Sequence, residues 1–336
     1  MAKVVVIGVG DWGSNLVRNF AELGALHGIC DVDEARAREA AGAYGARIYQ
    51  TTAEVCEDPE VGAVAIAVPA ALHYESASAA LRADKHCLVE KPLVLELADA
   101  LRLRDLAAER KLTLMVGHLL EHHPAVQKLG ELIERGALGR VHFLHCTRLN
   151  FGKVRQVENV LWDLAVHDVA MILRLMGKAP ESVTCCGGSF LNQGVAETAF
   201  AALSFGGGAH ASISVSWLYP QKEQKLVVVG SEAMAVFDDV AQENKLHLYD
   251  ARVEWVDRRP VTNRAQGQPI AYETIEPLKA ECRHFLECVE SGRTPLTDAE
   301  DAIRVLRVLT ACQSSLEQGG APRRLDEPRL RDCGIP

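Results

Sequence analysis

The sequence predicts an α/β protein of two domains: a parallel sheet covered by helices, then an α+β domain with a large, mainly antiparallel, open-faced sheet. At 336 residues the chain exceeds the size at which a single hydrophobic core stops growing. Up to Gly117, short apolar runs alternate with helix-length patterns, as in parallel sheets covered on both faces. Beyond Gly117 the apolar runs follow one another across turn residues, as in antiparallel sheets. We therefore expect one domain over residues 1–120 and a second over residues 121–336.

The expected strands of the first domain are short apolar runs, and each expected helix places apolar residues on one face. These strands are expected at residues 4–7, 28–30, 61–68, 87–89 and 112–116, and the helices at 16–23, 35–44, 72–81 and 98–108. In the second domain, strands are expected at 141–149, 182–186, 199–205, 210–217, 225–229 and 235–239, with helices at 124–135, 161–176, 278–291 and 299–317. Gly206, Gly207 and Gly208 separate two of these strands and predict a hairpin turn.

The composition is that of a protein that stays in water. Apolar residues make up 48% and charged residues 24%, and no apolar run approaches the roughly 20 residues that a membrane span requires. A net charge of -9 provides no electrostatic footprint for a nucleic-acid backbone. The ten cysteines include no Cys-x-x-Cys pair, and the first residues lack a secretory signal. We expect a cytoplasmic protein with reduced cysteines and with no nucleic-acid or membrane partner.

The glycine pattern after the first expected strand predicts a dinucleotide site in a Rossmann fold. Gly8, Gly10 and Gly13 open the first helix, with Asp11 and Trp12 between them. The first glycine permits a tight turn, the second lets the backbone approach a pyrophosphate, and the third lets the helix pack on the strand. The helix N-terminus adds N–H groups that face an anion. We expect all five residues to line the cofactor.

Asp31 ends the second expected strand and indicates which dinucleotide binds. Its carboxylate would accept hydrogen bonds from the adenosine ribose hydroxyls and would repel a ribose phosphate, so NAD is favoured over NADP. Arg36 and Arg38 follow closely and keep NADP open as an alternative. A second alternative is that Asp31 only caps the next helix and that the glycines form only a turn.

The segment Glu90-Lys91-Pro92, after the expected strand 87–89, carries a resemblance to a known family. Together with the glycine pattern it is similar to the family of glucose–fructose oxidoreductase, inositol dehydrogenase and the MocA-type proteins (Gfo/Idh/MocA). The resemblance implies that Lys91 is catalytic and lies beside nicotinamide and substrate, that Glu90 belongs to the cofactor site, and that the proline peptide is often cis. Pro69 and His73 resemble the segment that lines the cofactor in this family.

Asp163 and His167 form a second candidate catalytic element. They lie four residues apart in the expected helix 161–176, so both can point from one helix face. Oxidation of a secondary alcohol requires a hydride acceptor and a base whose pKa is near neutrality, and a neutral histidine suits that role. The resemblance implies that His167 takes the hydroxyl proton. A cationic Lys91 can hydrogen-bond the developing alkoxide or pass its proton on, and Asp163 can orient the lysine or the histidine. A buried ion pair that caps the helix is the alternative.

A polar segment before this helix suggests an anionic substrate. Cations and amides of this kind can surround an anionic, hydroxyl-rich ligand, although a solvated charged loop would have the same composition. The candidate substrate residues are Arg148, Asn150, Lys153, Arg155 and Asn159.

The histidines after residue 117 allow three interpretations. His118 and His122 lie four residues apart with Glu121 between them, and they could contact substrate, pack at a helix entry or bind a metal. We expect substrate contact and no metal, because alcohol oxidation in the resembled family needs none.

Residues 117–167 are similar to the branch of the family that acts on nucleotide sugars in surface-polysaccharide and lipid A biosynthesis. The resemblance implies NAD-dependent oxidation at C3 of a UDP-linked amino sugar, and UDP-N-acetylglucosamine is the preferred candidate. The 3-keto product would pass to an aminotransferase. UDP-N-acetylglucosaminuronate, inositol or a free sugar are alternative substrates, and a non-catalytic NAD-binding sensor is an alternative of another class. Members of the resembled family form dimers and tetramers, which suggests a homotetramer formed through the outer face of the second domain's sheet.

Overall fold

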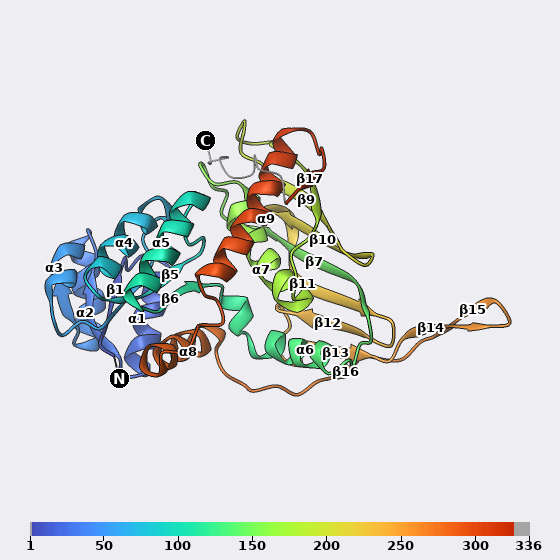
Figure 1. The fold of residues 1–336 in the computed structure, drawn as a ribbon, viewed down its shortest axis with the longest axis horizontal. Coiled ribbons are helices and arrows are strands. Elements are labelled where there is room, and N and C mark those ends of the chain that lie inside the picture. The colour runs from blue at the N-terminus through green and yellow to red at the C-terminus, as the bar shows by residue number, and fades with distance from the viewer. Residues whose placement is uncertain (1, 326–336) are drawn as a thin grey trace. The chain divides into compact units, whose positions relative to one another are not determined.

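The computed structural model describes residues 2–325, which form two compact units (Figure 1). The first unit comprises residues 2–123 together with Ile275–Leu306, and the second comprises Pro124–Thr274 together with residues 307–325. The first boundary lies three residues from the expected one, but the segment Ile275–Leu306 was expected in the second domain and belongs to the first unit.

The first unit is built on a six-stranded parallel sheet with the strand order β3-β2-β1-β4-β5-β6. Its strands are β1 (Val4–Ile7), β2 (Leu26–Cys30), β3 (Arg47–Tyr49), β4 (Ala63–Ile66), β5 (His86–Glu90) and β6 (Leu114–Gly117). Its helices are α1 (Gly13–Glu22), α2 (Glu34–Tyr44), α3 (Thr52–Glu57), α4 (His73–Arg82), α5 (Leu97–Arg110) and α8 (Pro277–Ser291), with single turns η1 (Ala70–Leu72) and η2 (Leu119–His122). Every residue of β1 and β4 is buried, which confirms the predicted sheet covered on both faces.

Helix α8 belongs to the first unit because its apolar face completes that unit's core. Phe285 meets Phe20 of α1 edge to face, with ring centroids 6.4 Å apart. Leu278, Cys282 and Phe285 are buried in the same cluster as the apolar residues of β1 and α1. A helix with an apolar stripe must bury that stripe, and the first unit's core is where it lies.

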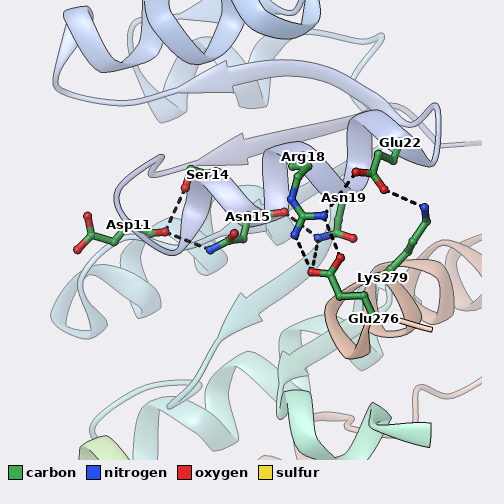
Figure 2. A network of polar contacts seen from close by, with 8 residues as sticks. All are labelled: Asp11, Ser14, Asn15, Arg18, Asn19, Glu22, Glu276 and Lys279. Atoms are coloured by element: carbon green, nitrogen blue, oxygen red, sulfur yellow. Dashed lines mark hydrogen bonds and ion pairs between the residues drawn. The ribbon is translucent and has the colours of Figure 1, made fainter. Parts of the chain in front are cut away.

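Polar contacts reinforce this packing at the rim (Figure 2). Both terminal nitrogens of Arg18 on α1 donate to the Glu276 carboxylate, at 2.9 and 2.6 Å. Lys279 of α8 donates to Glu22 of α1 at 2.8 Å. At the other end of α1, Ser14 and Asn15 donate to the carbonyl oxygen of Asp11, which closes the first turn of the helix.

The second unit is built on a nine-stranded mixed sheet with the order β16-β13-β12-β11-β7-β10-β9-β8-β17. Its strands are β7 (Val141–Phe151), β8 (Ser182–Gly188), β9 (Thr198–Phe205), β10 (Ala209–Ser216), β11 (Leu218–Gly230), β12 (Met234–Asp238), β13 (Leu246–Tyr249), β16 (Gln268–Pro269) and β17 (Arg323–Arg324). Neighbours pair antiparallel except β7 and β10, so the prediction of a mainly antiparallel sheet is confirmed. Gly206, Gly207 and Gly208 form the expected turn between β9 and β10.

Helices α6 (Pro124–Glu134) and α7 (Val166–Met176) belong to the second unit, and α7 is preceded by the single π-type turn η3 (Leu161–Ala165). Helix α9 (Ala299–Glu317) begins in the first unit and ends in the second. The hairpin β14 (Arg252–Val256) and β15 (Arg259–Asn263) forms a separate two-stranded sheet, drawn at the right of Figure 1. No helix among residues 2–325 is both long and apolar enough to cross a membrane.

Candidate active site

The loop between β1 and α1 has the glycines that a dinucleotide requires. Gly8 has a φ of 88°, and a Cβ built on it would lie 2.8 Å from the backbone of Ala67. A Cβ on Gly13 would lie 1.9 Å from the carbonyl oxygen of Gly8. A Cβ on Gly10 would meet only the Arg36 side chain, at 3.9 Å, so the backbone there is open to a ligand. This cradle at the N-terminus of α1, which exposed Asp11 and Trp12 border, fits a pyrophosphate.

Asp31 follows β2 and its carboxylate faces the same loop. Its Oδ2 accepts a hydrogen bond from the Val9 amide at 2.7 Å, and its Oδ1 accepts one from the Asp33 amide at 2.8 Å. The Arg36 guanidinium lies 3.9 Å away. The backbone donors therefore hold a carboxylate beside the loop. There it can accept hydrogen bonds from the ribose hydroxyls and would repel a ribose phosphate.

Glu90 ends β5 and Lys91 follows it, which brings the predicted catalytic lysine to this loop. The indole Nε1 of Trp12 donates to Oε1 of Glu90, and the Lys91 amide donates to Oε2 of Glu90 at 3.3 Å. The peptide between Lys91 and Pro92 is cis, as the resemblance implied. Burial raises the pKa of Glu90 to about 7, although the Trp12 donor and the Lys91 charge oppose that rise. The structure thus joins Trp12, Glu90 and Lys91, which stand far apart in the sequence.

His73 lies between two backbone carbonyls. It is buried, with Nδ1 2.8 Å from the carbonyl oxygen of Pro92 and Nε2 2.8 Å from that of Val68. Both ring nitrogens are thus directed at backbone carbonyls, so the ring holds the Lys91-Pro92 turn against the end of β4. A cofactor contact of His73 stays a prediction, and Pro69 beside it is exposed.

The histidines after β6 are buried in the first unit. Nε2 of His122 lies 3.2 Å from the Thr297 hydroxyl, and the ring lies 5.1 Å from that of His284. These contacts match the helix-entry packing that the sequence left open, so the predicted substrate contact of His122 is corrected to packing. His118 differs because neither ring nitrogen has a hydrogen-bond partner within residues 2–325. Burial lowers the pKa of His118. The Asp301 charge opposes this shift and the nearby Lys91 charge adds to it, and the net shift favours a neutral imidazole close to the lysine.

In the second unit, Asp163 lies in the π-type turn η3 and His167 in the first turn of α7. The Trp217 indole donates to Oδ2 of Asp163 at 3.0 Å, and Arg155 donates to Oδ1 at 3.2 Å. Trp217 is almost fully buried at the end of β10, so it holds the carboxylate from a rigid position. Sequence reasoning missed it, because Trp217 alternates with Ile213 and Val215 and indicates only a core strand.

The predicted substrate residues divide into two groups. Arg148 is buried in β7, where its Nε and Nη2 donate to Asp168 at 3.2 and 3.0 Å. Asn159 is buried as well, and it donates to Gln313 at 2.7 Å and accepts from the Leu161 amide at 3.0 Å. The predicted substrate contacts of these two residues are therefore corrected to contacts inside the unit.

The second group, Asn150, Lys153 and Arg155, remains a candidate for substrate contact. Lys153 and Arg155 are exposed, and Asn150 is half-buried at the end of β7. Arg155 contacts Asp163 and is also open to solvent, with 42% of its side chain exposed. The exposed middle of this segment is therefore cationic, while its beginning is part of the sheet and its end is buried.

Two family models match the chain. The oxidoreductase family with an NAD-binding Rossmann fold matches residues 2–118, and the GFO/IDH/MocA C-terminal domain matches residues 126–236. The UDP-N-acetylglucosamine 3-dehydrogenase of Acidithiobacillus ferrooxidans is 28% identical over 93% of this chain and 96% of its own length. Its solved structure superposes with a TM-score of 0.83, at 27% identity over 94% of this chain and 98% of that one.

Two further relatives show the range of chemistry near this chain. The myo-inositol 2-dehydrogenase of Thermotoga maritima is 29% identical over 94% of this chain and 96% of its own length. The solved structure of GenD2 from gentamicin A biosynthesis, in complex with NAD, superposes with a TM-score of 0.81 at 26% identity and covers 97% of both chains. The two named dehydrogenases thus differ in the sugar or polyol they take, and GenD2 is a structural relative that binds NAD.

Proposed function

Because the chain belongs to the GFO/IDH/MocA oxidoreductase family, as an NAD-binding dehydrogenase of CH–OH groups, we propose that it oxidises C3 of UDP-N-acetylglucosamine. One observation carries the substrate assignment: the segment that contacts Asp163 has exposed cations, Lys153 and Arg155, in its middle. Guanidinium and ammonium groups suit a diphosphate, and a neutral sugar would not require them. The similarity to the Acidithiobacillus dehydrogenase supports the same substrate class.

Each candidate catalytic residue has a role that its surroundings support. When bound, NAD supplies the acceptor for the hydride that leaves the carbinol carbon. The Lys91 ammonium, next to the Glu90 carboxylate, donates to the hydroxyl oxygen as negative charge develops on it. His167 takes the hydroxyl proton, and Asp163, fixed by Trp217, orients the base.

The cofactor role rests on the first unit alone. The Gly8–Gly13 loop holds the pyrophosphate, and Asp31 accepts hydrogen bonds from the ribose hydroxyls. The hydrogen bond from Trp12 to Glu90 connects this loop to the residue before the lysine. His118, neutral and close to Lys91, is the candidate in this unit for a contact with substrate.

The test is NADH formation from NAD and UDP-N-acetylglucosamine, coupled to a glutamate-dependent sugar aminotransferase that consumes the 3-keto product. We expect NADH to accumulate with UDP-N-acetylglucosamine and not with UDP alone. The coupling enzyme also shows whether the product is a ketone that an aminotransferase accepts, as the proposed place in lipopolysaccharide and lipid A biosynthesis requires. If UDP-N-acetylglucosaminuronate alone supports turnover, the proposed sugar is wrong but the nucleotide assignment stands.

A second candidate substrate is inositol or a free sugar. It is favoured by the similarity to the Thermotoga myo-inositol 2-dehydrogenase and by the Arg155–Asp163 ion pair, which partly neutralises one of the two cations. If NADH forms with myo-inositol and with neither UDP-sugar, the protein is an inositol dehydrogenase and the proposed function is wrong. Arg155→Ala and Lys153→Ala separate the two candidates, because they should weaken UDP binding measured by calorimetry and leave inositol binding unchanged.

A further inference from the structure

A buried carboxylate in the second unit organises a loop that the proposed chemistry does not use. Glu197, directly before β9, is 0% exposed. Its carboxylate accepts hydrogen bonds from the backbone amides of Phe190, Leu191 and Asn192, at 2.5, 3.2 and 2.9 Å. Burial acts to raise the pKa of Glu197, but these amide donors outweigh it and lower the pKa below its usual range. An ionised carboxylate therefore holds residues 189–196, which we call the Phe190 loop.

The Phe190 loop presents an aromatic ring to solvent. The Phe190 side chain is 72% exposed. A Cβ built on Gly188 would lie 2.5 Å from the tip of the ring, so the glycine leaves the room in which the ring rests against the backbone. An aromatic side chain has only two side-chain torsions, and one on a fixed loop loses little conformational entropy when a ligand binds. The loop thus offers a flat apolar surface in a defined place.

Hydrogen bonds join the base of this loop to the turn that carries Asp163. The Trp217 amide donates to the carbonyl oxygen of Glu197 at 3.0 Å, and the Trp217 indole donates to Asp163 at 3.0 Å. The Val160 amide, directly before η3, donates to the carbonyl oxygen of Ala196 at 3.0 Å. The loop therefore begins beside the residues that fix the candidate catalytic carboxylate.

The loop also contacts the cationic segment. The side-chain amide of Asn192 donates to the carbonyl oxygen of Gln156 at 3.2 Å. Gln156 directly follows Arg155, whose guanidinium donates to Asp163 at 3.2 Å. Exposed Lys153 lies two residues before Arg155. An exposed aromatic ring and two exposed cations thus lie on hydrogen-bonded loops, and both loops are joined to the turn with Asp163.

We propose that Phe190 is the platform on which the base of the nucleotide sugar stacks, next to the cations that hold its diphosphate. The inference rests on the proposed function, because only a nucleotide sugar brings a planar base to this loop. Stacking between a base and an aromatic side chain uses the faces of both rings and tolerates different bases. An inositol or a free sugar has no base, so Phe190 favours nucleotide sugars over free ones. Glu197 keeps this specificity residue in place.

The experiment compares the binding of UDP with that of dihydrouridine diphosphate. The two nucleotides carry the same charges, but the dihydrouracil ring is puckered and not aromatic, so it stacks poorly. Calorimetry is done with the protein saturated with NAD, so that neither nucleotide can occupy the dinucleotide site. The variants are Phe190→Ala, which removes the ring, and Phe190→Tyr, which keeps it. Trp255→Ala removes an equally exposed aromatic side chain on β14 and is the matched control.

We expect the wild-type protein to bind UDP about fivefold or more tightly than dihydrouridine diphosphate. Phe190→Ala should weaken UDP binding by about the same factor and remove the difference between the two nucleotides, because the stacking surface is lost. Phe190→Tyr should restore both, and Trp255→Ala should keep the wild-type values.

Two results would overturn the inference alone. If Phe190→Ala binds UDP as tightly as the wild-type protein, or if it weakens both nucleotides equally, no base stacks on this ring. Either result leaves the proposed function standing, since UDP still binds. A wild-type protein that binds neither nucleotide contradicts the proposed substrate as well, so the failure of the inference and the failure of the proposed function are distinguishable.

Discussion

At the scale of single residues, Lys91 is the proposed catalytic group of the first unit. Lys91→Ala should lower kcat by about 100- to 10,000-fold, because the developing alkoxide loses its donor. NAD binding, measured by calorimetry, should persist, since the glycine loop and Asp31 remain. Lys222→Ala, at an exposed position on β11, is the control. Near-normal turnover in Lys91→Ala would refute the catalytic assignment.

Trp217 should matter through one hydrogen bond. Trp217→Phe removes the donor to Asp163 and keeps most of the ring, so we expect kcat to fall about tenfold or more while the melting temperature changes little. Trp255→Phe, at a 73% exposed position on β14, should leave both unchanged. A higher KM with an unchanged kcat would show that Trp217 shapes the binding site and does not orient Asp163.

Arg148 should matter for stability. Arg148→Ala leaves the Asp168 carboxylate buried without its partner, which should reduce the free energy of unfolding by about 3–5 kcal/mol in urea titrations. Lys153→Ala, at an exposed position, should not change it. If Arg148→Ala instead kept full stability and lost UDP affinity, the buried ion pair would not be the role of this residue.

The fate of individual residues shows which of them a sequence can identify. The glycines, Glu90 and Lys91 act through local backbone geometry, so their motif predicts their place. Arg148 and Asn159 have the same polar character as exposed Lys153, but their partners Asp168 and Gln313 come from other elements. Only tertiary packing decides which of these polar groups meets solvent.

At the scale of elements, α8 is the piece that local patterns could not assign to a domain. Its helical periodicity predicts the helix, but not that Phe285 packs on Phe20 of α1 across more than 260 residues of chain. Likewise β3 was missed because Arg47 and Ile48 are exposed, so this edge strand has no apolar run. The hairpin β14–β15 was missed for the same reason, since its residues are mostly exposed.

Removal of the α8 anchor should destabilise the first unit. Phe285→Ala should reduce the free energy of unfolding by about 3–5 kcal/mol, because it leaves a cavity in a closed core. Lys279→Ala breaks only the exposed pair with Glu22 and should reduce it by less than about 1 kcal/mol. Equal effects of the two variants in a chemical denaturation experiment would contradict the role of α8 as part of the core.

At the scale of the whole molecule, the sheet of the second unit presents Phe143 and Phe200 on one face, 36% and 51% exposed. Aromatic side chains on an open sheet face favour association, and we propose a homotetramer formed through this face. Phe200→Asp should shift the sedimentation coefficient toward smaller species, whereas Val32→Asp in the first unit should not. A wild-type protein that sediments as a monomer would contradict the proposal.

The central claim is that NAD-dependent oxidation takes place at C3 of a UDP-linked amino sugar, and isotope transfer tests it most directly. UDP-N-acetylglucosamine deuterated at C3 is incubated with the enzyme and NAD, and the NADH formed is analysed by mass spectrometry. The account predicts deuterated NADH from the C3-labelled sugar and unlabelled NADH from a C4-labelled control. Deuterium transfer from C4, or no NADH from either sugar, would contradict it.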